Sequence, residues 1–68
     1  MEKVYEVSRA ERYEENFTIS LHRTEKGAEE RRKMEIEKEW GENKDVYNDR
    51  EDFDDTVFFN VNPIDLHD

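Results

Sequence analysis

The densest group of chemically active side chains lies in DVYNDREDFDDTVFF, residues 45–59, where five aspartates and one glutamate fall within eleven residues. These acids are Asp45, Asp49, Glu51, Asp52, Asp54 and Asp55. Clustered carboxylates can ligate a divalent cation, form an acid–base pair for hydrolysis, or bind a positively charged surface. Tyr47 and Phe53 are interleaved with the acids, and aromatic rings can anchor a contact that charge alone would leave loose.

Calcium binding is the first possibility to test against the spacing. An EF-hand loop needs oxygen ligands at fixed positions, a glycine at the sixth and a glutamate at the twelfth. Counted from Asp45, those two positions hold Arg50 and Thr56, and the register that starts at Asp49 fits no better. We therefore predict no specific metal site and no cofactor, with weak adventitious divalent binding as the alternative.

Catalytic arrangements are not supported either. A glycosidase-type carboxylate pair needs a cleft that raises one pKa and fixes the separation of two carboxyl groups, and a chain of 68 residues has little room to build one. Ser8 and Ser20 lack the glycine-rich elbow of serine nucleophiles. The only histidines are His22, on the predicted polar side of a strand, and His67, near the end of the sequence. We expect a protein that is not an enzyme.

The elements that must position the acids begin with two predicted strands, over about residues 3–9 and 16–22. The first has β-branched and aromatic residues suited to a strand, and the polar AERYEEN between the two predicts a hairpin connection. The second alternates apolar and polar side chains, which is typical of a strand with one dry and one wet face. Its predicted dry face holds Phe17, Ile19 and Leu21.

The segment TEKGAEERRKMEIEKEWGENK predicts a helix over residues 25–40. Thr24 can cap the free amides, Glu25 favours the first turn, and Gly41 with Asn43 offers a stop. The apolar stripe is narrow and consists of Ala28, Ile36 and Trp40, with the aliphatic stem of Arg32 between them. Such a stripe can cover one face of a sheet. Met34 lies away from it and is predicted to be an ordinary exposed residue, with a partner contact as the alternative.

After the helix, residues 42–55 show neither a helical nor a strand period and are predicted to be an acidic loop. Its tethers to the body are predicted to be Val46, Tyr47 and Phe53. TVFFNVNPIDLHD then alternates apolar residues in a last strand over about 56–62. We expect Pro63 to end the ladder, because proline has no amide hydrogen to donate.

The order strand, strand, helix, strand predicts an α+β fold in a single domain spanning 1–68. It consists of a three-stranded antiparallel sheet with one helix packed on one face. The second face is then open. We expect it to carry Ser20, His22, Phe58 and Asn60.

Charge is distributed unevenly along the chain. Residues 42–68 hold nine acidic and two basic residues, which accounts for −7 of the net charge of −9. The sequence has no cysteine and no apolar run of the length that a signal peptide or a membrane span requires. We therefore expect a soluble, cytoplasmic protein with no membrane partner.

The acidity makes direct binding of nucleic acid a poor expectation, because such binding depends on Lys and Arg neutralising phosphates. The inverse is more attractive, since carboxylates spaced like phosphates can occupy a basic groove built for DNA or RNA. In an extended loop, acids on one side of the chain recur about every 6.8 Å, close to the phosphate spacing along a strand. The alternative reading of a charge run is a solubilising loop.

In its size, its charge and its lack of cysteine the chain resembles small acidic α+β proteins encoded by bacteriophages. Those proteins switch off host nucleases, anti-viral effectors or DNA-repair enzymes by occupying a basic site. TISLHRTEKGAEERRKMEIEKEW followed by an acidic loop and TVFFNVNPIDL is also similar to small bacterial and phage domains of no assigned activity. Neither likeness rests on a motif, so no residue role is carried over, and the balanced helix departs from strongly acidic mimics.

The sequence thus predicts a non-enzymatic inhibitor of phage or mobile-element type. Its partner is expected to be a basic protein surface, the nucleic-acid channel of a host defence or DNA-processing protein. The predicted binding residues are the six acids of 45–55 with Tyr47 and Phe53. The alternative is a structural or accessory module that forms a homodimer through the open sheet face.

Overall fold

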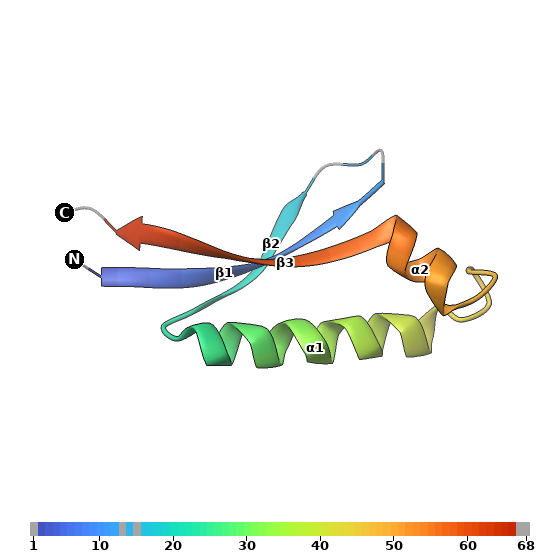
Figure 1. The fold of residues 1–68 in the computed structure, drawn as a ribbon, viewed down its shortest axis with the longest axis horizontal. Helices are drawn as coiled ribbons and strands as arrows, with labels where there is room; N and C mark the ends of the chain where they lie inside the picture. Colours follow the sequence, from blue (N-terminus) through green and yellow to red (C-terminus); the bar gives the residue numbers. More distant parts are fainter. Residues whose placement is uncertain (1, 13, 15, 67–68) are drawn as a thin grey trace.

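The computed structural model describes residues 2–12, 14 and 16–66. This part of the chain forms one three-stranded antiparallel sheet, one long helix and one short helix (Figure 1). The elements are β1 (Glu2–Glu11), β2 (Phe17–His22), α1 (Glu25–Glu42), α2 (Arg50–Thr56) and β3 (Val57–Leu66). The predicted α+β fold, with one main helix across one face of the sheet, is confirmed.

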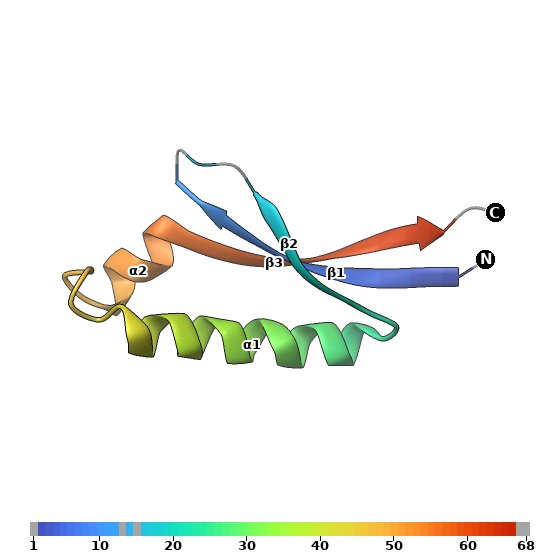
Figure 2. The same cartoon turned by 180° about the vertical axis from the view of Figure 1, so that it is seen from behind.

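Strand β1 lies in the middle of the sheet, in the order β2-β1-β3. It pairs with β3 over ten positions, from Glu2 opposite Leu66 to Glu11 opposite Val57. Both views of the ribbon show α1 running along one face of the sheet, with α2 at the end of the molecule opposite the two chain ends (Figures 1 and 2). The molecule is elongated as a result, with extents of 46 × 23 × 15 Å.

Helix α1 begins where the sequence predicts and ends two residues later. Thr24 is the N-cap, and its hydroxyl accepts from the Gly27 amide at 3.0 Å. The helix passes through Gly41, which therefore does not stop it, and ends at Glu42. Asn43 closes the end instead, because its backbone and side-chain amides each donate to the Glu39 carbonyl at 3.0 Å.

The prediction of a loop over all of residues 42–55 is wrong, because residues 50–56 form helix α2. Asp49 caps its first turn and accepts from the Asp52 amide at 2.8 Å. Two acids in the first turn favour this end of the helix through its dipole. Phe53 is the single residue that α2 buries, which is too little for a periodic pattern to reveal.

Pro63 does not end β3, which continues to Leu66. The amide of Arg12 bonds to the Thr56 carbonyl at 2.9 Å, and in an antiparallel pair such bonded positions recur at every second residue. The even-numbered residues of β3 therefore bond to β1, and the backbone groups of the odd-numbered residues point to the free edge. Pro63 stands at an edge position, where its missing amide hydrogen costs no ladder bond.

A bulge changes which side chains of β2 face the helix. The register against β1 shifts between Val7 and Ser8, so that Ile19 is the extra residue of β2. Ser20 lies opposite Val7, which is fully buried, and His22 lies beside Gly27 at the start of α1. The prediction that Ser20 and His22 occupy the open face is therefore wrong, and Leu21, predicted on the dry face, is exposed there instead.

The core lies between the sheet, α1 and α2. Its buried cluster is Phe53, Val57 and Phe59, against which Ile19, Ile36, Trp40 and Tyr47 pack. Ala28, on the inner side of α1, is fully buried. Met34 is 56% exposed on the outer side of the same helix, as its place away from the stripe predicts. The core is small and depends on each of its aromatic rings.

We predict that Phe59→Ala costs about 3 to 5 kcal/mol of unfolding free energy, because it leaves a cavity beneath α1. A 68-residue domain has roughly 3 to 10 kcal/mol in total, so much of the variant should be unfolded at 37 °C. Met34→Ala is the matched control and should melt close to the wild type. Equal losses in thermal melts of the two variants would contradict this arrangement of the core.

Candidate functional site

The acids singled out in the sequence lie on and around α2, and we call this group the acidic α2 surface. It comprises Asp45, Asp49, Glu51, Asp52, Asp54 and Asp55. All are exposed except Asp52, which is half-buried. Asp52 accepts from the backbone amide of Asn48 at 3.1 Å, while Asp49 caps the helix. Two of the six acids therefore also fix the local backbone.

The spacing of these acids is helical, so the phosphate-like spacing of an extended loop does not apply over residues 50–56. On a helix, residues three and four apart are neighbours with Cβ atoms about 5 to 6 Å apart. Glu51 therefore has Asp54 and Asp55 as its neighbours on α2. Three carboxylates gather on one side of a short helix, and no basic residue lies in its last turn.

Arg50 is the cation that joins α2 to α1. It donates to Glu37 of α1 at 2.9 Å and to Asp54 at 3.3 Å. These carboxylates raise the pKa of the Arg50 guanidinium, with the bond to Glu37 contributing most. The guanidinium also lies 5.7 Å from the ring centres of both Trp40 and Phe53. Sequence reasoning missed this role, although the i,i+4 spacing of Arg50 and Asp54 was visible.

Of the three predicted tethers, two hold the acidic segment to the body and one does not. Phe53 is 1% exposed and packs its ring 5.5 Å from Trp40 and 5.1 Å from Tyr47. Tyr47 is half-buried, with its ring edge-on to Phe53. Val46 is 71% exposed and makes no such contact.

The burial of Phe53 corrects its predicted place at the binding surface. A ring inside the core is not available to a partner while the fold is intact, because exposing it would empty the centre of the cluster. Tyr47 keeps part of its side chain accessible beside the acids. Within the acidic segment, Phe53 therefore positions the carboxylates and is not itself a contact residue for a partner.

The last turns of α1 are fixed to the sheet by Arg9 of β1, which binds Glu39 of α1 through two hydrogen bonds of 2.7 and 2.8 Å. Arg9 also donates to Glu11. These bonds raise the pKa of the Arg9 guanidinium, and the bond from Arg9 lowers the pKa of the Glu11 carboxyl. Since both Arg9 and Glu39 are mostly buried, the pair fixes the C-terminal half of α1, and with it Glu37, against the sheet.

A groove of about 350 Å³ runs between α1, α2 and the free edge of β3. Its apolar lining comes from Ile36, from Phe58 at the edge of the sheet, and from Phe53, Val57 and Phe59, which are almost fully buried. Asp54, Asn60 and Arg32 also line the groove, and the guanidinium of Arg32 is held in place by donating to the Phe59 carbonyl at 2.7 Å. The groove thus brings apolar side chains together with one carboxylate and one guanidinium.

In the described part of the chain, no three histidine, cysteine or carboxylate side chains meet in a way that could hold a metal ion. The Ser20 hydroxyl oxygen and the Nε2 atom of His22 lie 2.7 Å apart. Both residues are on the side of β2 that faces α1, and neither lines the groove. His67 lies outside the described residues. None of the helices in this region is both long and apolar enough to cross a membrane.

Comparisons with protein-family models, with curated proteins and with solved structures found no match to this chain. The assignment of function therefore rests on the geometry and charge of the chain itself.

Tyr47 gives a test of how the acidic segment is held. Burial raises the pKa of its phenol above the ordinary value of 10.0, and the charges of Glu39 and Glu11 add to the effect. A raised folded-state pKa gives stability that is present below about pH 10 and is lost as the pH rises through the folded value.

We therefore predict that Tyr47→Phe changes the pH dependence of stability. Between about pH 9 and 11, the free energy of unfolding of the wild type should fall more steeply than that of the variant, as measured by urea unfolding. Parallel curves of unfolding free energy against pH for the two proteins over this interval would show that burial does not raise the pKa of the Tyr47 phenol.

Proposed function

We propose that this protein is a non-enzymatic binding protein that docks its acidic α2 surface onto a basic surface of another protein. The observation that carries the proposal is the fixing of α2 by Phe53, which supports an ordered display of carboxylates. Binding then requires little ordering of the segment, so that less of the interaction energy is lost as conformational entropy. A merely solubilising loop needs no such anchor.

The groove beside α2 supports a partner rich in Arg or Lys. The long aliphatic stem of either side chain suits the apolar part of the groove lining, and its charged head suits the carboxylate of Asp54. Asp54 is already shared with Arg50, whose bond to it is longer than its bond to Glu37. An incoming cation can therefore compete for Asp54 while Arg50 stays bound to α1.

The partner class we favour is a protein that binds nucleic acid. Such proteins carry basic grooves that recognise phosphates, and exposed carboxylates can occupy these grooves with the same electrostatic steering. With the resemblance to small acidic phage inhibitors, this makes an inhibitor of a host defence or DNA-processing protein the proposed role. Because these acids lie on a helix, their spacing differs from that of the predicted extended loop. Their negative charge and their exposure are as predicted.

The test uses a variant in which four acids are neutralised without removing the cap of α2. The substitutions are Asp49→Asn, Glu51→Gln, Asp52→Asn and Asp54→Asn. Asparagine is as good an N-cap as aspartate, and the removal of like charges relieves repulsion, so the fold should be kept. Circular dichroism and a thermal melt confirm this before any binding measurement.

We predict that this variant binds at least about tenfold more weakly than the wild type to partners captured from a bacterial lysate at low salt. Its binding should also depend less on salt, because fewer charges are screened. DNA or RNA added in excess should displace the wild type from the same partners. Full retention of binding by the variant, or no displacement by nucleic acid, would contradict the proposal.

A matched control removes the same amount of negative charge at the opposite end of the molecule. Its substitutions are Glu25→Gln, Glu29→Gln, Glu30→Gln and Asp65→Asn. These acids lie at the start of α1 and near the end of β3, far from α2 (Figure 1). The control should bind like the wild type. An equal loss of binding in both variants would mean that net charge, and not the acidic α2 surface, determines the interaction.

A further inference from the structure

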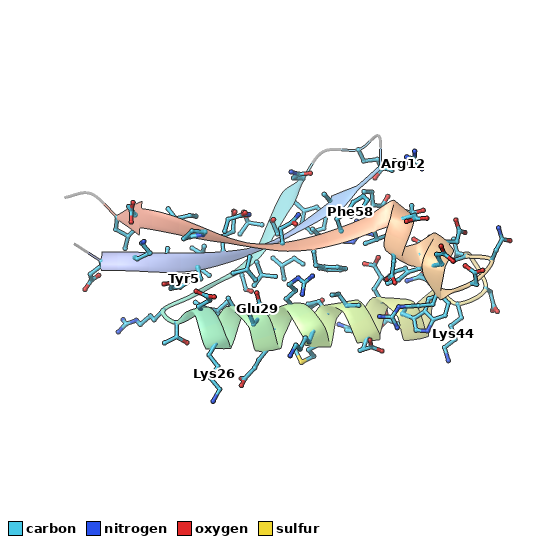
Figure 3. The ribbon with its side chains drawn as sticks, viewed as in Figure 1. Tyr5, Arg12, Lys26, Glu29, Lys44 and Phe58 are labelled. Atoms are coloured by element: carbon cyan, nitrogen blue, oxygen red, sulfur yellow. The ribbon has the colours of Figure 1, made fainter. Side chains whose placement is uncertain are left out.

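The face of the sheet turned away from α1 is uncovered, and we call it the open face. It consists of the even-numbered residues of β1 and β3, together with Thr18 and Leu21 of β2. Figure 3 shows Phe58, which belongs to this face, on the side of β3 opposite the helix. Only Glu2 and Glu6 are charged among its twelve residues, whereas 46% of the whole chain is charged.

The open face is apolar toward both ends and polar at its centre. Phe58 is 44% exposed near one end, and Ile64 is 36% exposed toward the other. In the middle, Glu6 accepts from Thr18 and from the side-chain amide of Asn62, which also reaches Ser8 at 3.3 Å. The one carboxylate at the centre is therefore already surrounded by neutral donors.

The size and shape of the molecule indicate that a large surface is left to be covered. Its solvent-accessible area is 5292 Å², against roughly 4,600 Å² expected for a compact protein of this mass. Its radius of gyration is 13.5 Å, against about 11 Å expected for this length. The excess of roughly 700 Å² is spread over an elongated molecule, and in size it is close to the ~800 Å² that each partner buries in a stable interface.

We propose that a second copy of this chain covers the open face, forming a two-fold dimer with the two sheets face to face and α1 on the outside of each. For a second copy of the chain, charge selects this face. Two copies with a net charge of −9 each repel one another, and the open face contributes only two of those charges. It is the broad surface on which two copies can approach at the lowest electrostatic cost.

The two-fold axis runs across the strands and passes over the middle of the sheet, at Val7 and Val61. In this arrangement Phe58 packs over the partner's Ile64, and Asn60 lies over the partner's Asn62. On the central strand, Glu6 lies over the position of the partner's Ser8 and not over the partner's Glu6. The apolar ends cover one another, and the polar centres pair.

An axis parallel to the strands is disfavoured for two reasons. If it passed over the central strand, it would place Glu6 directly over the partner's Glu6, and like charges that face each other without screening are destabilising. It would also bring both α2 helices to the same end of the dimer. The axis across the strands keeps the two acidic α2 surfaces at opposite ends, along the 46 Å length of the molecule.

Sedimentation equilibrium tests the dimer over about a hundredfold range of protein concentration. The wild type should approach twice its monomer mass of 8.3 kDa as the concentration rises. Added salt should strengthen the dimer, because it screens the repulsion between two acidic chains. A wild type that stays monomeric throughout this range, at low and at high salt, would overturn the proposal.

Phe58→Glu should weaken the dimer at least about tenfold, since it places a charge in an apolar contact. Met34→Glu adds the same charge to an exposed apolar residue on the outer side of α1 and should leave the dimer unchanged. Both residues are exposed in the monomer, so neither change threatens the fold, and thermal melts check this. Equal effects of the two substitutions would overturn the assignment of the interface to the open face.

Cysteine cross-linking tests the direction of the axis, because the chain has no cysteine of its own. Two sheets packed face to face lie about 10 Å apart, which is too far for an unstrained disulfide, so a bismaleimide of about that length is the cross-linker. Each thiol adds across one maleimide double bond, and Phe58→Cys combined with Ile64→Cys should give covalent dimers. Phe58→Cys alone should not, because the two copies of residue 58 lie at opposite ends. Cross-linking by the single variant, or none by the double variant, would overturn the proposed arrangement.

Discussion

The burial of Phe53 is the constraint on which the rest of the molecule depends. A three-stranded sheet with one helix on one face has a thin core, and this ring closes the end of the core that α1 leaves open. Its contacts with Trp40 and Tyr47 bring a strongly acidic stretch against the body, where a short helix can form. Four of the six carboxylates, Glu51, Asp52, Asp54 and Asp55, share the helix of this ring, so stability and most of the display of charge come from the same seven residues.

The elements with long or repeated patterns could be predicted from the sequence, and the short ones could not. The eighteen residues of α1 have a clear cap and a stripe with helical spacing, whereas α2 offers one apolar residue in seven. Its local signals were the pattern Asp49-x-x-Asp52, which resembles a capping box, and the i,i+4 pair Arg50 and Asp54, in a run that is also typical of an acidic loop. Phe53 was correctly predicted to tether the acids, but the depth of its burial depends on Trp40, which is distant in sequence.

Two further differences arise from hydrogen bonding between strands, which a single sequence does not reveal. The bulge in β2 reverses the alternation after Ile19, so that His22 turns toward α1 and Leu21 turns away. Pro63 is tolerated because β3 is an edge strand whose odd-numbered residues direct their backbone groups outward. In both cases the sequence correctly predicted a strand. The pairing register with β1 then determined which way the side chains and backbone groups point.

The arrangement of charge gives the acidic segment a second consequence, beyond any partner it binds. Repulsion between copies is lowest when their acidic α2 surfaces are far apart, so the position of α2 at one tip of an elongated molecule disfavours every association that brings two tips together. The open face carries little charge and lies along the length of the molecule. The same carboxylates that we propose to bind a basic partner therefore also restrict how two copies of the chain can meet, and the proposed dimer leaves both acidic ends accessible.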